Sequence, residues 1–392
     1  MMKLQEVCEV YSGYALKEFH DDEEGYPVIK IGNICSDGTL DLEKCQFTND
    51  SVNEKYFSKK GDIYVALSGA TTGKIGIITT DDKYIINQRV GIVRKNDEEI
   101  PDQYIKYFLM NKTEKILEDA SGCAQPNISP KQIGQYEFPK GDYSEMRNIS
   151  DILDRISNVI MQRKQELQKL DELIKARFVE LFADFIERTK PVDFESICEF
   201  VTVGIANSAT HAFCDDGVIM FRNQNIKEDY LDTSDIVHIT PDFADKYKTK
   251  RLKKNDLLIV RTGYPGVACL VPEQFEGSQT FTTLIARIKS DASVNPRFVC
   301  HYINSEYGKK YVKDNSAGAA QQNFGATALS KLPICIPTIE SQDEYIRFLE
   351  QVDKSKIVWL KAPNIINYTH EKLAPYMYKT YRRNAKWQIL NF

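Results

Sequence analysis

The sequence predicts two tandem α/β domains, each followed by a helical segment. Three observations lead to this fold class. The chain repeats itself after roughly 195 residues, each copy opens with short apolar runs between turn residues, and a long heptad pattern follows the first copy. A repeat of this length is large enough to be a whole domain.

Six pairs of segments carry the repeat, and they occur in the same order in both copies. The clearest pair is Lys60-Gly61-Asp62-Ile63 and Lys254-Asn255-Asp256-Leu257. The others pair residues 26–34 with 217–226, 68–69 with 262–263, 101–111 with 296–305, 124–127 with 320–323, and positions 133, 153 and 156 with 329, 349 and 352. Their common order indicates a tandem duplication with small insertions.

The first part of each copy is predicted to contain β-strands. Residues 63–67 and 257–260 are apolar runs bounded by turn residues, a pattern typical of buried strands. Short helices are expected to follow, for example around residues 104–115. Each copy therefore mixes strands with short helices before its long helical segment begins.

A long helix is predicted over residues 146–182. Eleven positions spaced alternately by three and four residues form a seam, and nine of them are apolar, with Arg163 and Arg177 as the exceptions. Such a seam extends over about five heptads. Three further apolar residues widen it: Ile152, Val159 and Leu173. We expect so wide a stripe to contact more than one partner.

The helical segment of the second copy is predicted to be shorter. Its apolar positions begin with Tyr345 and continue through Leu349 and Val352. Pro363 then intervenes, and proline cannot continue a helix. The tail 364–392 carries five basic residues and one acidic residue and has no clear seam.

The composition is that of a folded, soluble protein with two or three domains. Of the 392 residues, 42% are hydrophobic and 27% are charged. A net charge of −5 counts mildly against nucleic-acid binding, although basic residues adjoin each other in places. We see neither a signal peptide nor an apolar run of the ~20 residues that a bilayer requires, so a cytoplasmic protein is expected.

The common motifs of DNA-modifying enzymes are missing. The sequence has no Pro-Pro dipeptide, which amino-methyltransferases usually carry in the loop that grips the target amine. Residues 69–74 resemble a phosphate-binding loop but are one residue short, and Ile75 stands where a hydroxyl belongs. The nine cysteines include no C-x-x-C pair. We therefore expect no catalytic residue and no metal ligand.

The repeated units resemble the specificity subunits of type I restriction–modification systems. The resemblance covers nearly the whole chain and rests on short pieces in a fixed order: Ser12-Gly13, residues 29–34, Gly61-Asp62-Ile63, the glycine turn 69–73, residues 124–129 and a long helix that ends Glu180-Leu181-Phe182. Each piece is weak alone, and their order and duplication make the match specific. The shortened second helix departs from the family pattern.

The resemblance implies two target-recognition domains, at 1–145 and 189–340. The helical segments, at 146–188 and 341–392, would form an antiparallel coiled-coil spacer. A helix of about 37 residues spans roughly 55 Å, more than one DNA turn of ~34 Å. The implied partners are double-stranded DNA, two methyltransferase subunits and restriction subunits. S-adenosylmethionine, ATP and Mg²⁺ would be bound by those subunits and not by this chain.

The candidate DNA-binding residues are polar side chains that can hydrogen-bond to bases and phosphates. In the first domain they are Lys30, Asn33, Ser68, Thr71, Thr72, Lys74, Arg89, Gln125 and Asn127. In the second they are Arg222, Asn223, Gln224, Arg261, Thr262, Tyr264, Gln321, Gln322 and Asn323. Asn127 and Asn323 have an alternative role as helix or turn caps.

The candidate surface for partner docking is the apolar stripe of the long helix. Its residues are Ile149, Leu153, Ile156, Ile160, Leu167, Leu170 and Ile174. Two alternatives to a working specificity subunit stay open at this point. One is a degenerate or silent cassette that cannot assemble because its second helix is incomplete, and the other is a self-contained DNA-modifying enzyme.

Overall fold

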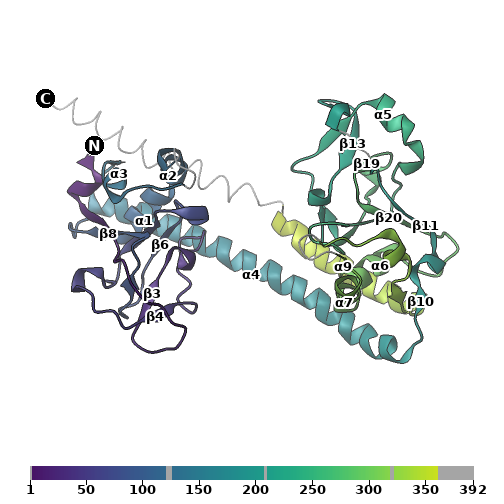
Figure 1. The fold of residues 1–392 in the computed structure, drawn as a ribbon, viewed down its shortest axis with the longest axis horizontal. Coiled ribbons are helices and arrows are strands. Elements are labelled where there is room, and N and C mark those ends of the chain that lie inside the picture. The colour runs from purple at the N-terminus through teal and green to yellow at the C-terminus, as the bar shows by residue number, and fades with distance from the viewer. Residues whose placement is uncertain (1, 121–125, 207–209, 318–321, 361–392) are drawn as a thin grey trace. The chain divides into compact units, whose positions relative to one another are not determined.

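The computed structural model describes residues 2–120, 126–206, 210–317 and 322–360. Gln125, Gln321, Pro363 and the basic tail 364–392 lie outside these residues. The chain forms two compact units, one built on the residues up to Glu166 and the other running Leu167–Val358. A single helix, α4 (Tyr143–Arg188), contributes to both units (Figure 1).

The described residues of the first unit form two larger sheets, one two-stranded pair and three short helices. The larger sheet is antiparallel, in the order β2 (Cys8–Ser12), β8 (Val90–Lys95), β5 (Ile63–Ala66) and β6 (Ile75–Ile77). The smaller sheet has the order β4 (Gln46–Thr48), β3 (Tyr26–Ile29) and β7 (Ile85–Ile86). The helices are α1 (Asp102–Met110), α2 (Thr113–Ala120) and α3 (Pro130–Gly134). The other elements are the pair β1 (Met2–Lys3) and β9 (Glu137–Phe138), and the 3-10 turns η1 (Leu4–Glu6), η2 (Ile31–Asn33), η3 (Glu54–Tyr56) and η4 (Gly69–Thr71).

Strand β5 is buried on both faces, which explains why its sequence is continuously apolar. Ile63 and Val65 belong to the core that includes Phe108 of α1. Tyr64 and Ala66 belong to a separate core on the other side of the strand. A strand covered on both faces loses the alternation of polar and apolar residues that a half-exposed strand shows.

The second unit repeats this architecture. Its larger sheet has the order β11 (Cys198–Val203), β20 (Leu284–Ile288), β17 (Leu257–Ile259) and β18 (Ala268–Leu270). Its second sheet has the order β12 (Phe213–Cys214), β16 (Val237–Ile239), β13 (Val218–Phe221) and β19 (Gln279–Thr280). The helices are α5 (Pro241–Lys246), α6 (Pro296–Asn304), α7 (Glu306–Asp314) and α8 (Ala326–Ser330). The other strands are the pair β10 (Val192–Asp193) and β21 (Pro333–Ile334) and the hairpin β14 (Ile226–Lys227) and β15 (Tyr230–Leu231). The 3-10 turns are η5 (Phe194–Ile197), η6 (Thr210–Ala212), η7 (Asn223–Asn225), η8 (Lys248–Lys250) and η9 (Glu273–Phe275).

The duplication extends to individual side chains. Asp62 is buried and binds Arg94 at 2.6 Å, while Asp256 is buried and binds Arg287 at 2.7 Å. In both copies the same aspartate accepts a backbone N–H from three residues earlier, at 2.8 Å. The repeated Gly/Asn-Asp-Ile/Leu sequence therefore marks a buried ion pair that links the two central strands of the larger sheet in each copy.

The residue before each of these aspartates has a left-handed backbone. Gly61 has φ 88° and Asn255 has φ 65°. Glycine adopts this conformation without strain, and asparagine tolerates it better than most residues do. This backbone requirement explains why asparagine can stand in the second copy where the first copy has glycine.

Helix α4 is longer than the sequence pattern predicts. Asp142 starts it, because its carboxylate accepts the N–H of Ser144 at 3.2 Å and its carbonyl accepts the N–H of Met146 at 3.0 Å. The helix continues to Arg188, shortly before Pro191. Among the described residues, no helix is both long and apolar enough to cross a membrane.

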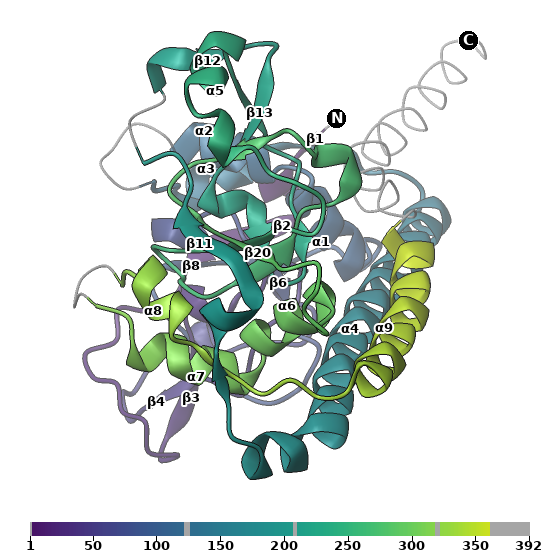
Figure 2. The ribbon, with the colours of Figure 1, turned by 90° about the vertical axis from the view of Figure 1, so that its right-hand side faces the viewer.

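Helix α9 (Ile339–Leu360) packs antiparallel against the second half of α4 (Figure 2). Arg177 binds Glu344 at 2.6 Å and Lys356 binds Asp171 at 2.5 Å, so the two helices run in opposite directions. Phe178 and Tyr345 meet at a centroid distance of 5.5 Å in the core between them. The predicted mixed fold, with two tandem domains and a helical spacer, is confirmed.

Candidate DNA interface

Most candidate residues of the first unit are gathered at the end of strand β5. Ser68 forms an antiparallel backbone bridge with Asn127. The bridge is extended by the N–H of Gly69, which donates to the carbonyl of Pro126 at 3.2 Å, and by the N–H of Ile128, which donates to Leu67 at 2.9 Å. A segment almost 60 residues further along the chain is thus held beside the glycine turn. We call this set, with Thr71, Lys74 and Arg89, the first polar rim.

Arg89 and Lys74 join the first polar rim through their backbones. The carbonyl of Arg89 accepts the N–H of Leu67 at 3.0 Å, and the carbonyl of Lys74 accepts the N–H of Ala66 at 2.9 Å. The Arg89 side chain is exposed. Lys30 has a different environment, because its ammonium lies 3.4 Å from the centre of the Phe19 ring.

Two candidates of the first unit have structural roles instead. Asn33 is buried, and its side chain accepts the N–H of Lys30 at 2.8 Å and donates to the carbonyl of Asp41 at 2.9 Å. Thr72 is buried, and its hydroxyl donates to Gly69 at 2.7 Å. Both side chains are used to stabilise turns, and Asn225 repeats the role of Asn33 in the second copy.

The second unit brings its candidates together by the same backbone bridge, here between Thr262 and Asn323. Asn323 also accepts a hydrogen bond from Arg261 Nε at 3.1 Å. Asn223 donates to the Thr262 hydroxyl at 3.0 Å, and its carbonyl accepts the hydroxyl of Tyr264 at 2.7 Å. These residues, with Arg222, Gln224 and Gln322, form the second polar rim.

Asp235 is a member of this surface that the sequence pattern did not reveal. It accepts hydrogen bonds from Arg222 at 2.8 Å and from Gln224 at 2.6 Å, and its own side chain is 64% exposed. It lies more than ten residues from either partner, so no local signal marks it. The carboxylate and the backbone carbonyl of Asp235 both engage Arg222 Nη2, so the guanidinium is held in place by this residue.

Of the alternative role as helix or turn caps, the helix part is wrong for both Asn127 and Asn323. Helix α3 is capped by Ser129, whose hydroxyl accepts the N–H of Gln132, and α8 begins after Gly325. Both asparagines are exposed and lie in the bridges described above. The run 69–74 is a tight turn, as predicted, with Gly69 and Gly73 at φ 82° and 83°.

The candidate docking residues differ in burial along α4. Ile149, Leu153, Ile156 and Ile160 are partly buried within the described part of the chain, while Ile174 is buried in the core of the second unit. Leu167 and Leu170 are partly buried. Ile152, Val159 and Leu173, which widen the stripe, are between 44% and 51% exposed. An exposed apolar row of this kind marks a surface that can accept another helix or protein.

Comparisons with known proteins agree with this architecture. A family described as "Type I restriction modification DNA specificity domain" matches residues 1–172 and again 188–367. The specificity subunit of the Escherichia coli type I restriction enzyme EcoBI is 20% identical over 382 residues, which are 90% of this chain and 78% of that protein. The specificity subunit of StySPI from Salmonella potsdam is 23% identical over 363 residues, 86% of this chain and 77% of the relative.

Solved structures show the same fold. The S subunit of a type I restriction–modification system from M. genitalium aligns with a TM-score of 0.55 at 12% identity, covering 95% of this chain and 94% of the other. A chain from a structure of a type I restriction–modification system aligns with a TM-score of 0.53 at 13% identity, covering 97% and 96%.

These findings define a protein with two tandem DNA-specificity domains. The chain belongs to the family of type I restriction modification DNA specificity domains. The relatives named above are both specificity subunits of type I restriction enzymes.

Proposed function

We propose that this chain reads a bipartite DNA sequence, with one polar rim for each half of the target. The observation that carries the proposal is the duplicated backbone bridge, Ser68–Asn127 in one unit and Thr262–Asn323 in the other. Because the two rims are built in the same way, each can contact DNA in a similar manner and read one half of the target. Reading base edges requires hydrogen-bonding side chains and no nucleophile.

The chemistry of the two rims supports a division between bases and phosphates. Arg261, Asn223 and Gln322 belong to the residue types that form paired hydrogen bonds with guanine or adenine. Lys74 and Ser68 suit contacts with the phosphate backbone, which position a protein without reading sequence. Tyr264 is 43% exposed and can stack or donate at the edge of the second rim.

In this proposal, the helices space the two readers and dock the partner subunits. Residues 1–145 and 189–340 act as the recognition domains, and residues 146–188 and 341–392 as the helical regions. Methyltransferase subunits would bind along α4, whose exposed row supplies apolar contact area. Restriction subunits would join that core in the cytoplasm. The partners would supply S-adenosylmethionine, ATP and Mg²⁺ chemistry.

Pairing of α4 with α9 favours a working subunit over a silent cassette. The ion pair between Lys356 and Asp171 lies near the end of the described part of α9. The antiparallel packing therefore continues over most of the described helix.

Selection of DNA from a random duplex pool tests the proposal. The full chain, co-expressed with the methyltransferase subunits of its own genome, should enrich a motif of two fixed parts separated by a fixed gap. Arg261→Gln should reduce discrimination within one part only, by about 1–3 kcal/mol. Arg251→Gln, on the same unit but paired with Asp245 outside the rim, is the control.

A continuous motif, or no enrichment, would contradict the proposal. The chain alone, incubated with labelled S-adenosylmethionine and DNA, should transfer no methyl group. Transfer by a preparation free of partner subunits would instead support a self-contained enzyme.

A further inference from the structure

Arg297 of helix α6 is the centre of a partly buried charge cluster in the second unit. It binds Asp353 of α9 and lies 3.7 Å from Asp229. His301, one turn later on α6, lies 3.1 Å from Asp229 and 3.1 Å from the hydroxyl of Tyr345 on α9. The cluster therefore links three parts of the unit: the hairpin that carries Asp229, the first helix after the sheet, and the spacer helix.

Asp229 connects this cluster to the second polar rim. It lies between β14 and β15, with a left-handed backbone at φ 71°. Strand β14 follows η7, the turn that contains Asn223 and Gln224. Burial alone would raise the pKa of Asp229, but His301 and Arg297 outweigh burial and hold the pKa below its ordinary value. The cluster thus stabilises the charged form of a residue close in sequence to the rim.

The first unit contains a link of the same kind, built from different residues. Lys106 of α1, one of the buried charged residues, lies 3.4 Å from Asp154 of α4. Tyr107 donates to the same carboxylate at 2.7 Å. Lys106 and His301 occupy the same turn of the helix that the repeat aligns, residues 101–111 with 296–305. Both copies thus tie this helix to the neighbouring spacer helix through a charged residue and an aspartate.

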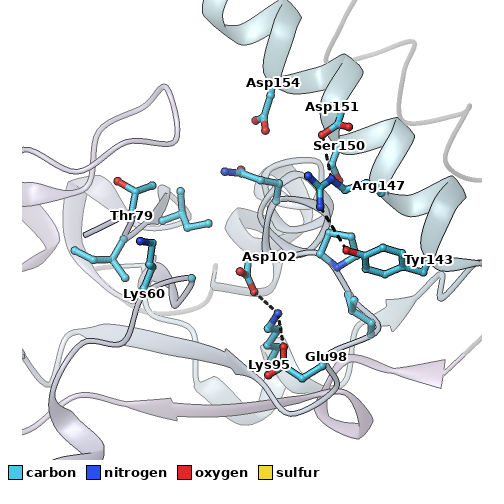
Figure 3. Close-up of a pocket in the computed structure, with 16 residues that line it drawn as sticks. Lys60, Thr79, Lys95, Glu98, Asp102, Tyr143, Arg147, Ser150, Asp151 and Asp154 are labelled. Atoms are coloured by element: carbon cyan, nitrogen blue, oxygen red, sulfur yellow. Dashed lines mark hydrogen bonds and ion pairs between the residues drawn. The ribbon is translucent and has the colours of Figure 1, made fainter. Parts of the chain in front are cut away.

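Asp154, one member of the link in the first unit, lines a groove. The groove has a volume of about 360 Å³. In Figure 3, Tyr143, Arg147 and Asp154 of α4 lie on one side of it, and Lys60 and Lys95 are among the residues opposite. Apolar packing of Met146 and Ile149 holds the helix to the core nearby. Apolar contacts are non-directional, whereas an ion pair has a defined geometry and its net contribution to stability can be small.

We propose that Arg297–Asp353 and Lys106–Asp154 are positioning pairs, which set the direction in which each recognition domain leaves its spacer helix and thereby the gap between the two half-sites. This inference rests on the proposed function. The inference adds that the gap between the half-sites depends on these side-chain pairs between each domain and its spacer helix, as well as on the length of the helices. Neither pair contacts DNA in this scheme. Removing a pair should therefore leave discrimination between bases unchanged and weaken the preference for one gap length.

Binding to duplexes with altered gaps tests the inference. Affinities of the full complex would be measured for the selected target and for duplexes with the gap changed by one base pair. Arg297→Gln and Asp353→Asn should each reduce the preference for the correct gap by roughly 10-fold, which corresponds to about 1.4 kcal/mol. Discrimination against base changes within either half-site should stay unchanged. Arg297→Lys, which keeps the charge, should restore much of the preference.

A matched control is Lys254→Gln, which breaks an exposed pair with Glu273 in the same unit. It should leave the gap preference unchanged. Asp353→Asn keeps the size of the side chain, and Arg297 still has the carboxylate of Asp229 beside it. This variant therefore tests the inference if Arg297→Gln does not fold. An unaltered gap preference in folded Asp353→Asn and Lys106→Gln would overturn the inference. A wild-type complex without any gap preference would overturn the proposed function itself.

Discussion

At the residue scale, the two polar rims differ in how freely their side chains can meet DNA. In the second rim, Arg222 and Gln224 share Asp235, and Arg261 binds Asn323. If the rim binds DNA as proposed, these contacts orient the side chains in advance and so reduce the entropy lost on binding. Arg89 in the first rim is exposed, and its contact to the rim is made by its backbone. We therefore expect the side chains of the first rim to lose more conformational entropy on binding DNA than those of the second rim.

The duplicated ion pair of the larger sheet should be important for stability. Asp256 is 1% exposed, so Arg287→Met would leave a buried carboxylate without its cation. Loss of one partner of a buried pair costs about 3–5 kcal/mol. We expect a loss of this size in urea unfolding of the second unit. Lys254→Met, which removes an exposed pair, should cost far less, and equal costs would show that Asp256 does not depend on Arg287.

Asp229 should make stability depend on acid pH. Its pKa lies below the ordinary value of 3.8, so the folded state favours the carboxylate. The resulting stability is fully present above the pKa of the unfolded chain, and it is lost as the pH falls through the lower pKa of the folded state. Asp229→Asn, which suits the left-handed backbone, should lower the melting temperature at neutral pH.

The difference in melting temperature between the wild type and Asp229→Asn should shrink as the pH falls below about 4. Thermal melts between neutral pH and pH 3 measure it. A difference that is constant with pH would mean that the carboxylate charge has no part in the cluster.

At the element scale, helix α4 presents one buried and one exposed face within the second unit. Phe178 is 3% exposed and packs against Phe182, Phe298 and Tyr345, while its neighbour Val179 is 50% exposed. Phe178→Ala should destabilise the unit by about 3–5 kcal/mol, because it removes a large buried side chain and leaves a cavity. Val179→Ala should change stability by less than about 0.5 kcal/mol. Chemical denaturation of both variants measures the contrast, and similar costs would contradict the described packing.

At the scale of the whole molecule, duplication predicts that the two units can be exchanged independently. The family match covers residues 1–172 and 188–367 as separate domains. Replacing residues 195–335 by the equivalent domain of a relative should change one half of the recognised sequence and leave the other half as it was. Mapping of methylated sites across a genome, before and after the exchange, measures this. A change in both halves would mean that the two domains do not read DNA separately.

The sequence alone determined the tandem architecture, because the signals behind it are local. Continuous apolar runs predicted β5 and β17, and the heptad spacing predicted most of α4, which extends beyond the predicted range of 146–182 at both ends. The repeated Asp62 and Asp256 segments were also visible as a pattern. Periodicity reports which face of an element is buried, and it needs no knowledge of the partner.

Only the tertiary structure decided which polar residues are free to act. Asn33 and Asn127 are both plausible readers in the sequence, yet one is buried in a turn and the other is exposed beside Ser68. Asp235 and the Arg297 cluster carry no local signal, since their partners lie far along the chain. Hydrogen bonds and ion pairs depend on which distant segments meet, and that is set by the packing of the two sheets and their helices, not by the order of residues within one element.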